Sequence, residues 1–316
     1  MTKMPDEKDR LILFELLQDC RQPLSKIAKS VNLPQQTVSY RIKRLEEDKV
    51  IKKYTVNIDY SKLGYRRNSL YLDLKDTSLE EVNKYLEQII GIKEVSCCYI
   101  LRDVGEWKIY VSVWTKTLER YDEIQTKILS KFKGKVNNYL SFASVKSYTY
   151  FAKRLNTKKI AKIDIKETQD KIELKDIDWK LLERLRKNSK IAILDLAKEL
   201  NIMAKTVVRK INLLKKKGII QRFYPLINPK KLGYDEYTFI ARVDPAYTKN
   251  IDEFVEFTKT DSRFIMVIRA VGYVNLSYSF LVQDDEELKE LSAKIEGILG
   301  DAILQNFKIE INDMIG

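Results

Sequence analysis

The strongest constraint on this chain is an internal repeat. Residues 9–65 align without a gap on residues 178–234, at a constant offset of 169 positions (178 − 9). The identical positions are mostly apolar and include Leu13/Leu182, Ala28/Ala197, Val38/Val207, Ile42/Ile211 and Leu45/Leu214. A repeat on this scale means that one folding unit occurs twice in the chain.

The bulk composition limits the class of protein. A length of 316 residues suffices for two to four domains. No apolar run is long enough to cross a bilayer, so we expect no membrane segment. The N-terminus is charged and lacks the apolar stretch of a secretory signal, so we expect a cytoplasmic protein whose three cysteines, Cys20, Cys97 and Cys98, are reduced.

The chain contains no histidine. Histidine is the commonest general acid or base near neutral pH and the commonest metal ligand. There is also no Cys-x-x-Cys pair of the kind that binds zinc. We therefore expect no catalytic residue, no metal and no cofactor.

Positive charge is concentrated in the repeated segments. The net charge of +13 divides into +4 for residues 1–65, +3 for 66–152, +14 for 153–234 and −8 for 235–316. Because Lys and Arg that neutralise phosphates release counterions, such an uneven charge favours a polyanionic partner. The simpler interpretation, that lysines only keep the surface soluble, suits the segment that joins the two copies.

Each copy of the repeat has the pattern of three helices followed by a strand. The second helix, the third helix and the strand are expected at Leu24–Val31, Gln35–Asp48 and Val50–Ile58 in the first copy, and at Ile193–Leu200, Ala204–Lys217 and Ile219–Ile227 in the second. Gly64 and Gly233 then suit a left-handed cap. Small helices joined by a tight turn, the last one amphipathic, indicate a helix-turn-helix.

A β-α-β-β-α-β pattern follows each copy and is typical of a ferredoxin-like domain. The sequence therefore predicts an α+β protein in which a winged-helix-like helix-turn-helix DNA-binding domain and a ferredoxin-like domain occur twice. The expected boundaries are 1–65 for the first DNA-binding domain, 66–151 for the first ferredoxin-like domain, 152–177 for a charged linker, 178–234 for the second DNA-binding domain and 235–316 for the second ferredoxin-like domain. Part of the linker could be helical.

The third helix of the first copy has two distinct faces. Val38, Ile42 and Leu45 form an apolar stripe that is expected to pack inward. The other face and its flanks carry polar side chains suited to phosphates and base edges. The DNA-binding candidates on this helix are Gln36, Ser39, Tyr40, Lys43 and Arg44.

The third helix of the second copy is more basic. Its candidates are Lys205, Arg209, Asn212 and Lys216. Arg209 is expected to contact a guanine, whose paired acceptors match the guanidinium fork, and Asn212 an adenine. Any amphipathic surface helix has a polar face, but its position after a tight turn, twice in the chain, favours DNA binding.

The run SKIAKSVNLPQQTVSYRIKRLEEDKVIKKY, followed by a β-α-β-β-α-β domain, resembles the Lrp/AsnC family of transcriptional regulators. The resemblance implies a double-stranded DNA partner, and a ligand-sensing (RAM) domain that mediates dimerisation and responds to a small-molecule effector such as an amino acid. It also implies that Lys52–Ile58 pairs with Gln221–Ile227, so that one chain acts as a covalent pseudo-dimer. A homo-oligomer could form through the ferredoxin-like domains.

The chain departs from the family pattern in two places. Pro34 and Met203 stand where the family places a serine at the start of the recognition helix, so the N-cap must be supplied otherwise. The family's ligand region tends to carry Gly-Asp-Tyr-Asp. The matching stretches here keep the glycines but few acidic residues, and their candidate ligand-binding residues are Gly105, Glu106, Gly272 and Asn275.

Two other functions compete with sequence-specific regulation. Some proteins built on a fused Lrp-like scaffold resemble sirohaem decarboxylases, and Arg66, Arg67 and Tyr71 could line a pocket for a tetrapyrrole carboxylate. Those enzymes are expected to use histidines, which this chain lacks. The other alternative is an architectural protein that binds DNA through phosphate contacts without sequence preference.

Overall fold

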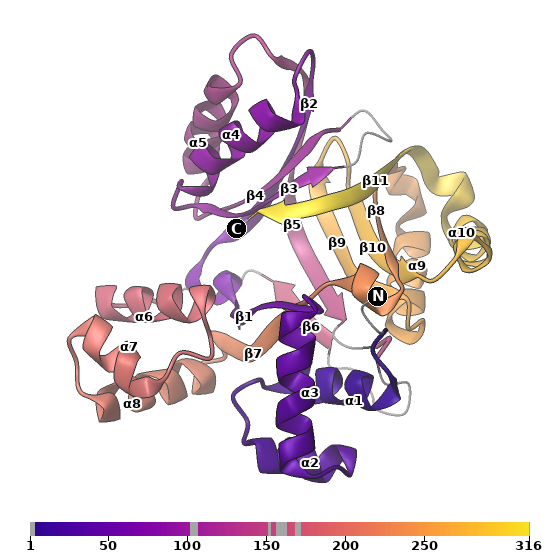
Figure 1. Cartoon of the computed structure of the whole chain (residues 1–316). Helices are drawn as coiled ribbons and strands as arrows, with labels where there is room; N and C mark the ends of the chain where they lie inside the picture. Colours follow the sequence, from indigo (N-terminus) through magenta and orange to yellow (C-terminus); the bar gives the residue numbers. More distant parts are fainter. Residues whose placement is uncertain (1–3, 102–106, 151–152, 156–162, 168–171, 316) are drawn as a thin grey trace. The chain divides into compact units, whose positions relative to one another are not determined.

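The structure, a computed structural model, describes residues 4–101, 107–150, 153–155, 163–167 and 172–315 (Figure 1). The chain divides into two compact units, and both copies of the repeat contribute to each. The helical unit comprises Met1–Leu63, Phe151–Lys162 and Asp170–Tyr234, and the sheet unit comprises Gly64–Tyr150, Ile163–Gln169 and Asp235–Gly316. The expected division into four domains therefore stays a prediction.

The helical unit contains the two predicted helix-turn-helix modules. The first consists of α1 (Glu7–Gln18), α2 (Leu24–Val31), α3 (Gln35–Glu47), strand β1 (Ile51–Ile58) and the 3₁₀ turn η1 (Tyr60–Leu63). The second consists of α6 (Asp176–Lys187), α7 (Ile193–Leu200), α8 (Ala204–Lys216), strand β7 (Ile220–Ile227) and the 3₁₀ turn η2 (Pro229–Leu232). Gly64 and Gly233 have φ of 77° and 80°, which confirms the predicted left-handed conformation.

The apolar stripe of each third helix is buried, as its spacing predicted. Val38, Ile42 and Leu45 are at most 5% exposed, and their equivalents Val207, Ile211 and Leu214 at most 6%. Both turns between the second and third helices place an asparagine, Asn32 or Asn201, at a φ of 52°. A left-handed residue ends the second helix and directs the chain into the third.

The two helix-turn-helix modules are joined by a strand ladder. β1 and β7 form a two-stranded antiparallel sheet, with Thr55 opposite Tyr224 and Val56 opposite Phe223. The pairing implied for Lys52–Ile58 with Gln221–Ile227 is therefore confirmed. The ladder pairs the two copies of one repeated strand inside a single chain, so the helical unit is a covalent pseudo-dimer.

Helices of each module also pack on the strand of the other. α6 contacts β1, and α1 contacts β7. Equivalent hydrogen bonds join them: the Cys20 N–H donates to the Phe223 carbonyl (2.9 Å), and the Ser189 N–H donates to the Tyr54 carbonyl (3.1 Å). Each module therefore packs against the strand of the other as well as its own.

The sheet unit contains the predicted β-α-β-β-α-β pattern twice. The first copy consists of β2 (Arg66–Leu74), α4 (Leu79–Ile90), β3 (Val95–Leu101), β4 (Ile109–Thr115), α5 (Leu118–Lys131) and β5 (Val136–Tyr150). The second consists of β8 (Asp235–Val243), the 3₁₀ turn η3 (Pro245–Tyr247), α9 (Thr248–Thr260), β9 (Phe264–Gly272), β10 (Leu276–Val282), α10 (Asp285–Leu299), the 3₁₀ turn η4 (Gly300–Ala302) and β11 (Ile303–Ile315). The predicted fold class, α+β with two ferredoxin-like domains, is confirmed.

The strands of the two copies close into a ring. The order is β2-β4-β3-β11-β8-β10-β9-β5, and β5 pairs again with β2. The two copies meet at the antiparallel pairs β3–β11 and β5–β9. Successive side chains point to opposite faces of a strand, so each strand contributes to an outer core under helices and to the interior of the ring. The outer cores are separate, and a third apolar cluster lies in the interior.

The described part of the linker contains a strand, and its last two residues begin helix α6. Ile163–Glu167 forms strand β6, which pairs antiparallel with β5. Its sequence alternates isoleucine with charged residues, a pattern with the period of a strand. Among the described helices, none is long and apolar enough to cross a membrane.

Candidate DNA-binding surface

The outer face of α3 presents the predicted polar side chains to solvent. Gln36, Ser39, Tyr40 and Lys43 are all exposed, and Tyr40 reaches 66% exposure. They lie opposite the buried stripe because the helical period separates the two faces. An exposed tyrosine beside polar groups presents a ring and a hydroxyl to a partner. Contact of these four residues with DNA stays a prediction.

Arg44 is engaged within the protein. Its Nη2 lies 2.6 Å from Oδ2 of Asp9, whose side chain is 0% exposed, and Arg41 donates to the other oxygen of Asp9 at 2.9 Å. A phosphate would therefore compete with a buried carboxylate for Arg44. Lys43 is less constrained, with a 3.7 Å exposed ion pair to Glu47 one turn along the helix.

The outer face of α8 is more open to an anionic partner. Lys205, Arg209, Asn212 and Lys216 are exposed. In the described part of the chain, no ion pair joins their cationic groups to a carboxylate. Charge on α8 is therefore less compensated than on α3, which carries acidic residues in its last turn.

The first turns of both recognition helices carry no side-chain cap. Pro34 and Met203 occupy the N-cap positions with extended ψ of 143° and 142°, and neither makes a capping hydrogen bond. The N-cap is thus not supplied by another side chain at these positions. Uncapped N–H groups at a helix start attract anions such as DNA phosphates.

Two apolar side chains on α8 were not among the predicted site residues. Val208 and Leu213 are 43% and 49% exposed. They occupy the positions of Ser39 and Arg44 in the first copy. An exposed aliphatic group on a recognition helix suits contact with a thymine methyl. The signal that could have identified them is in the repeat alignment, where apolar residues replace polar ones on the outer face.

The predicted ligand-binding residues have mainly structural environments where they are described. Gly105 and Glu106 lie outside the described residues. At Gly272, with φ of 143°, a Cβ would lie 3.0 Å from the Ser141 carbonyl oxygen, so glycine is needed for strand packing. The Asn275 side chain accepts from the Val243 N–H (2.8 Å) and donates to the Val243 carbonyl (2.7 Å). A ligand role for these positions stays a prediction.

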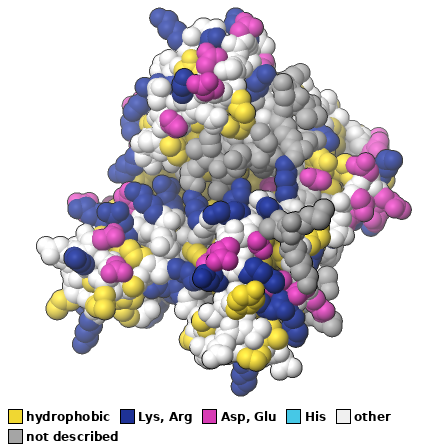
Figure 2. Space-filling model, viewed as in Figure 1, with side chains coloured by type: hydrophobic (Ala, Val, Ile, Leu, Met, Phe, Trp, Pro, Cys, Tyr) yellow, Lys and Arg dark blue, Asp and Glu magenta, His cyan; other side chains and the backbone are white. Residues whose placement is uncertain are grey.

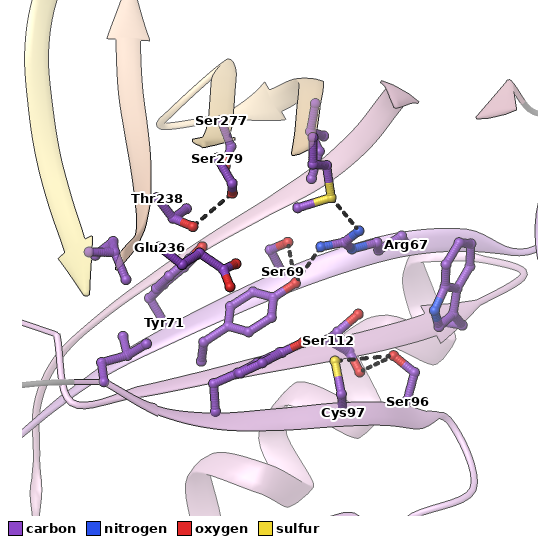
Figure 3. A pocket seen from close by; sticks show the side chains of 17 residues that line it. Arg67, Ser69, Tyr71, Ser96, Cys97, Ser112, Glu236, Thr238, Ser277 and Ser279 are labelled. Carbon is purple, nitrogen blue, oxygen red and sulfur yellow. Dashed lines mark hydrogen bonds between the residues drawn. The ribbon is translucent and has the colours of Figure 1, made fainter. Parts of the chain in front are cut away.

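The interior of the strand ring holds a cavity of about 220 Å³. Seven of the eight ring strands contribute to its lining, and Arg67 and Tyr71, considered for a tetrapyrrole carboxylate, are among the lining residues. Arg66, the next residue to Arg67, is exposed and does not line it. Figure 3 shows the labelled side chains converging on this space. The sequence predicted the strands of each copy, but the cavity depends on ring closure between the two copies.

Charge differs between the parts of the chain, as the sequence predicted. On the face shown in Figure 2, Lys and Arg side chains are spread over the helical unit, and acidic side chains gather over α10. The first turn of α10 contains Asp285, Glu286 and Glu287. A polyanion is therefore attracted to the helical unit more than to this helix.

The fold and the exposed faces of α3 and α8 define a winged helix-turn-helix DNA-binding protein. The family of that description matches residues 5–52 and 174–221. The chain is 30% identical to an uncharacterized HTH-type transcriptional regulator of Pyrococcus furiosus over 152 residues, 46% of this chain and 98% of that protein. It is 32% identical to the HTH-type transcriptional regulator LrpA of Pyrococcus abyssi over 132 residues, 42% of this chain and 90% of LrpA. The chain belongs to the Lrp/AsnC family of DNA-binding transcriptional regulators and contains the family's unit twice.

A solved structure also matches the fold of nearly the whole chain. The crystal structure of the siroheme decarboxylase NirDL aligns with a TM-score of 0.60 at 14% identity, covering 98% of this chain and 92% of NirDL. At this identity the likeness concerns the fold alone. It shows that the tandem arrangement of these domains in one chain occurs in another protein.

Proposed function

We propose that one chain binds an asymmetric double-stranded DNA site with two unlike recognition helices. The observation that carries this proposal is the β1–β7 ladder, which joins the modules of α3 and α8 in one unit. A homodimer presents two identical helices and reads a palindrome, because its symmetry matches that of the site. Here the two helices differ at almost every exposed position, so the two half-sites differ as well.

The proposed roles of the residues follow from their chemistry and exposure. Arg209 contacts a guanine and Asn212 an adenine, and Gln36 contacts an adenine edge in the other half-site. Tyr40 and Ser39 contact the sugar-phosphate backbone, as do Lys43, Lys205 and Lys216. Arg44 mainly positions α3 through Asp9 and reaches a phosphate only at the expense of that ion pair.

The proposal is tested by selecting bound duplexes from a random DNA pool with the full chain at moderate salt. We expect two unlike half-sites at a fixed spacing of about 10 bp or a multiple of it. Selection with the Arg209→Ala chain should show weaker base preference in one half-site and an unchanged preference in the other. Enrichment of a palindrome would contradict the asymmetry, and tight binding without any enrichment would indicate an architectural protein.

Three further properties belong to the same proposal. A regulator of this kind acts in the cytoplasm, where its DNA is. A small-molecule effector acts on the sheet unit, and chains associate through their ferredoxin-like domains.

Since the ring order pairs both edges of each four-stranded sheet, such association would use surfaces other than those edges. Sedimentation of the full chain with and without DNA measures the assembly.

A sirohaem-decarboxylase-like activity is the second candidate. It is supported by the fold likeness to NirDL and by the position of Arg67 and Tyr71 in the cavity. The absence of histidine opposes it. The cavity of about 220 Å³ is also below the range of about 300–1,000 Å³ for drug-sized ligands, and a tetrapyrrole is larger still. An absorbance shift and loss of carboxylate from an added iron tetrapyrrole would support this function over regulation alone.

A further inference from the structure

We propose that the interior of the strand ring binds a small aromatic carboxylate bearing a hydroxyl or amino group, with Arg67 contacting the carboxylate and Glu236 the opposite group. The cavity belongs entirely to the sheet unit. The proposal therefore does not depend on how the recognition helices contact DNA. Closed rings of eight strands have interiors wide enough to hold one small ligand.

The wall of the cavity is polar at selected points in an otherwise apolar interior. Arg67, Ser69 and Tyr71 alternate along β2 with the buried residues of the outer core, so all three face the cavity. Aromatic side chains from the neighbouring strands complete the wall on this side, with Tyr99, Tyr110 and Trp114 among them. An apolar and aromatic lining with a few convergent polar groups is typical of a ligand site.

Arg67 brings a positive charge into this interior without a negative partner. Its Nη2 donates to the Tyr110 hydroxyl (2.8 Å), its Nη1 lies 3.5 Å from the Met266 sulfur, and its buried Nε has no hydrogen-bond partner. Within the described residues, no ion pair joins Arg67 to a carboxylate. A guanidinium with an unused donor in a buried site favours a ligand carboxylate.

The groups beside Arg67 do not provide the missing negative charge. Burial raises the pKa of the Tyr71 phenol, and it also raises the pKa of the Tyr99 phenol and of the Cys97 thiol. All three are therefore neutral near pH 7. Apart from Glu236 on the opposite wall, the residues that line the cavity therefore offer the guanidinium no carboxylate, and a ligand carboxylate could supply one.

Glu236 occupies the position of Arg67 in the second copy, because 67 + 169 is 236. Arg67 lies opposite Trp114 on β4, and Glu236 lies opposite Leu281 on β10. Figure 3 shows the two side chains reaching the cavity from opposite sides. In a symmetric homodimer both positions would carry the same residue, so duplication has made one wall cationic and the other acidic.

The surroundings of Glu236 limit the charge of the ligand. Its wall carries hydroxyl groups from Thr238, Ser277 and Ser279, which accept or donate hydrogen bonds without adding charge. A phosphate with two negative charges would be repelled by Glu236, whereas a monocarboxylate with a donor at its far end satisfies both walls. The volume of about 220 Å³ restricts the ligand to a small molecule.

The test is titration calorimetry of the full chain with para-hydroxybenzoate, para-hydroxyphenylacetate and para-hydroxyphenylpropionate. These acids place the carboxylate at increasing distances from the hydroxyl, so they cover different separations of Arg67 and Glu236. We expect at least one to bind, and its neutral amide to bind on the order of 10- to 100-fold more weakly. Binding should also change the fluorescence of Trp114, which lines the cavity.

Matched variants separate this site from adventitious binding. Arg67→Met should weaken the acid on the order of 10- to 100-fold, whereas Arg66→Met, one residue away and exposed, should leave its affinity unchanged. Glu236→Gln should abolish the preference for a hydroxyl over a methoxy group, with the exposed Asp235→Asn as its control. Circular dichroism checks the fold of Arg67→Met, and Glu236→Gln keeps the test valid if that variant unfolds.

The outcomes decide the proposal independently of DNA binding. Equal affinity for an acid and its amide, equal effects of Arg67→Met and Arg66→Met, or no binding of any of the three acids at millimolar concentration would each overturn it. DNA selection could fail while the acid binds, or succeed while no acid binds. Failure of the ligand site is therefore distinguishable from failure of the proposed function.

Discussion

The two recognition helices share a buried face and differ on the exposed one. The stripe of α3 and the stripe of α8 consist of the same three residue types, all buried. On the outer faces, Glu46, Glu47 and Asp48 of the first copy are replaced by Lys215, Lys216 and Lys217 in the second. Packing restricts the stripe, because a buried side chain must match its neighbours in volume. No such restriction applies outside.

The same contrast appears in the cavity of the sheet unit. Arg67 and Glu236 occupy equivalent positions with opposite charge, while the surrounding strand order is the same in both copies. In a homodimer two equivalent positions always carry the same residue, because both subunits have the same sequence. Duplication within a chain removes this limit. The two copies of a surface can then change independently. The two recognition helices can differ in their DNA contacts, and the two walls of the cavity can differ in charge.

The largest expected difference between the copies concerns the buried aspartate of the first helix. Asp9→Asn leaves Arg41 and Arg44 without their shared carboxylate and should destabilise the first module by about 3 kcal/mol. Asp178→Asn breaks a single ion pair with Lys210 and should cost about 1 kcal/mol. Hydrogen exchange of the α1 and α3 amides, compared with those of α6 and α8, measures both values. Equal losses would contradict the difference between the two networks.

The next effect concerns DNA affinity. Arg209→Ala should weaken the selected site by about 1–3 kcal/mol and relax one base position, because it removes a base contact. Lys216→Ala is the control, and it should weaken all duplexes alike and reduce the salt slope by about 1. Fluorescence anisotropy on the selected and on a random duplex measures the two. If Arg209→Ala weakened both duplexes equally, Arg209 would contact phosphate only.

A smaller difference is expected in acid. Partial burial acts to raise the pKa of Asp6, but hydrogen bonds from Arg41 and from the Asp9 N–H outweigh it and hold that pKa below its usual value. The resulting stabilisation is present above the unfolded pKa of about 3.9 and is lost as the pH falls through the folded value. Asp6→Asn should therefore make the stability of the first module depend less on pH in acid. The second module should be unaffected, since its equivalent residue is Lys175. Hydrogen exchange at several pH values measures this dependence. The same loss of stability in acid with and without the substitution would contradict the prediction.

The smallest effect concerns Lys43. Glu47→Gln removes the exposed partner of Lys43 and a negative charge near the DNA, so it should tighten binding by about 0.2–0.5 kcal/mol. Glu183→Gln, which removes an equivalent exposed pair with Lys187 on α6, is the control. Fluorescence anisotropy at low salt is the best measurement of this small difference in affinity, because salt screens the effect of a surface charge. Weaker binding by Glu47→Gln would mean that the ion pair positions Lys43 for its contact.

Much of the fold could be predicted because it depends on local patterns. Helical spacing identified α3 and α8, and the repeated order of strand and helix patterns identified both ferredoxin-like domains. The β1–β7 pairing was implied by the family resemblance. The ion pair of Arg44 with Asp9 was missed, because a helical projection does not show what packs against its flank. Strand β6 was missed because its pattern lies in a charged linker and its partner is supplied by β5.

The sequence alone determined that one unit occurs twice, what its elements are, and which helix faces differ between the copies. These properties follow from the spacing of apolar residues, which each segment carries by itself. Only the tertiary structure decided that the sheets close into a ring, that Arg67 and Glu236 line one cavity, and that Asn275 is occupied by the backbone of Val243. These features depend on pairs of strands that lie far apart in the chain, such as β3 with β11. The backbone groups at a strand edge are alike in every strand, so the local sequence does not indicate which strand will pair there.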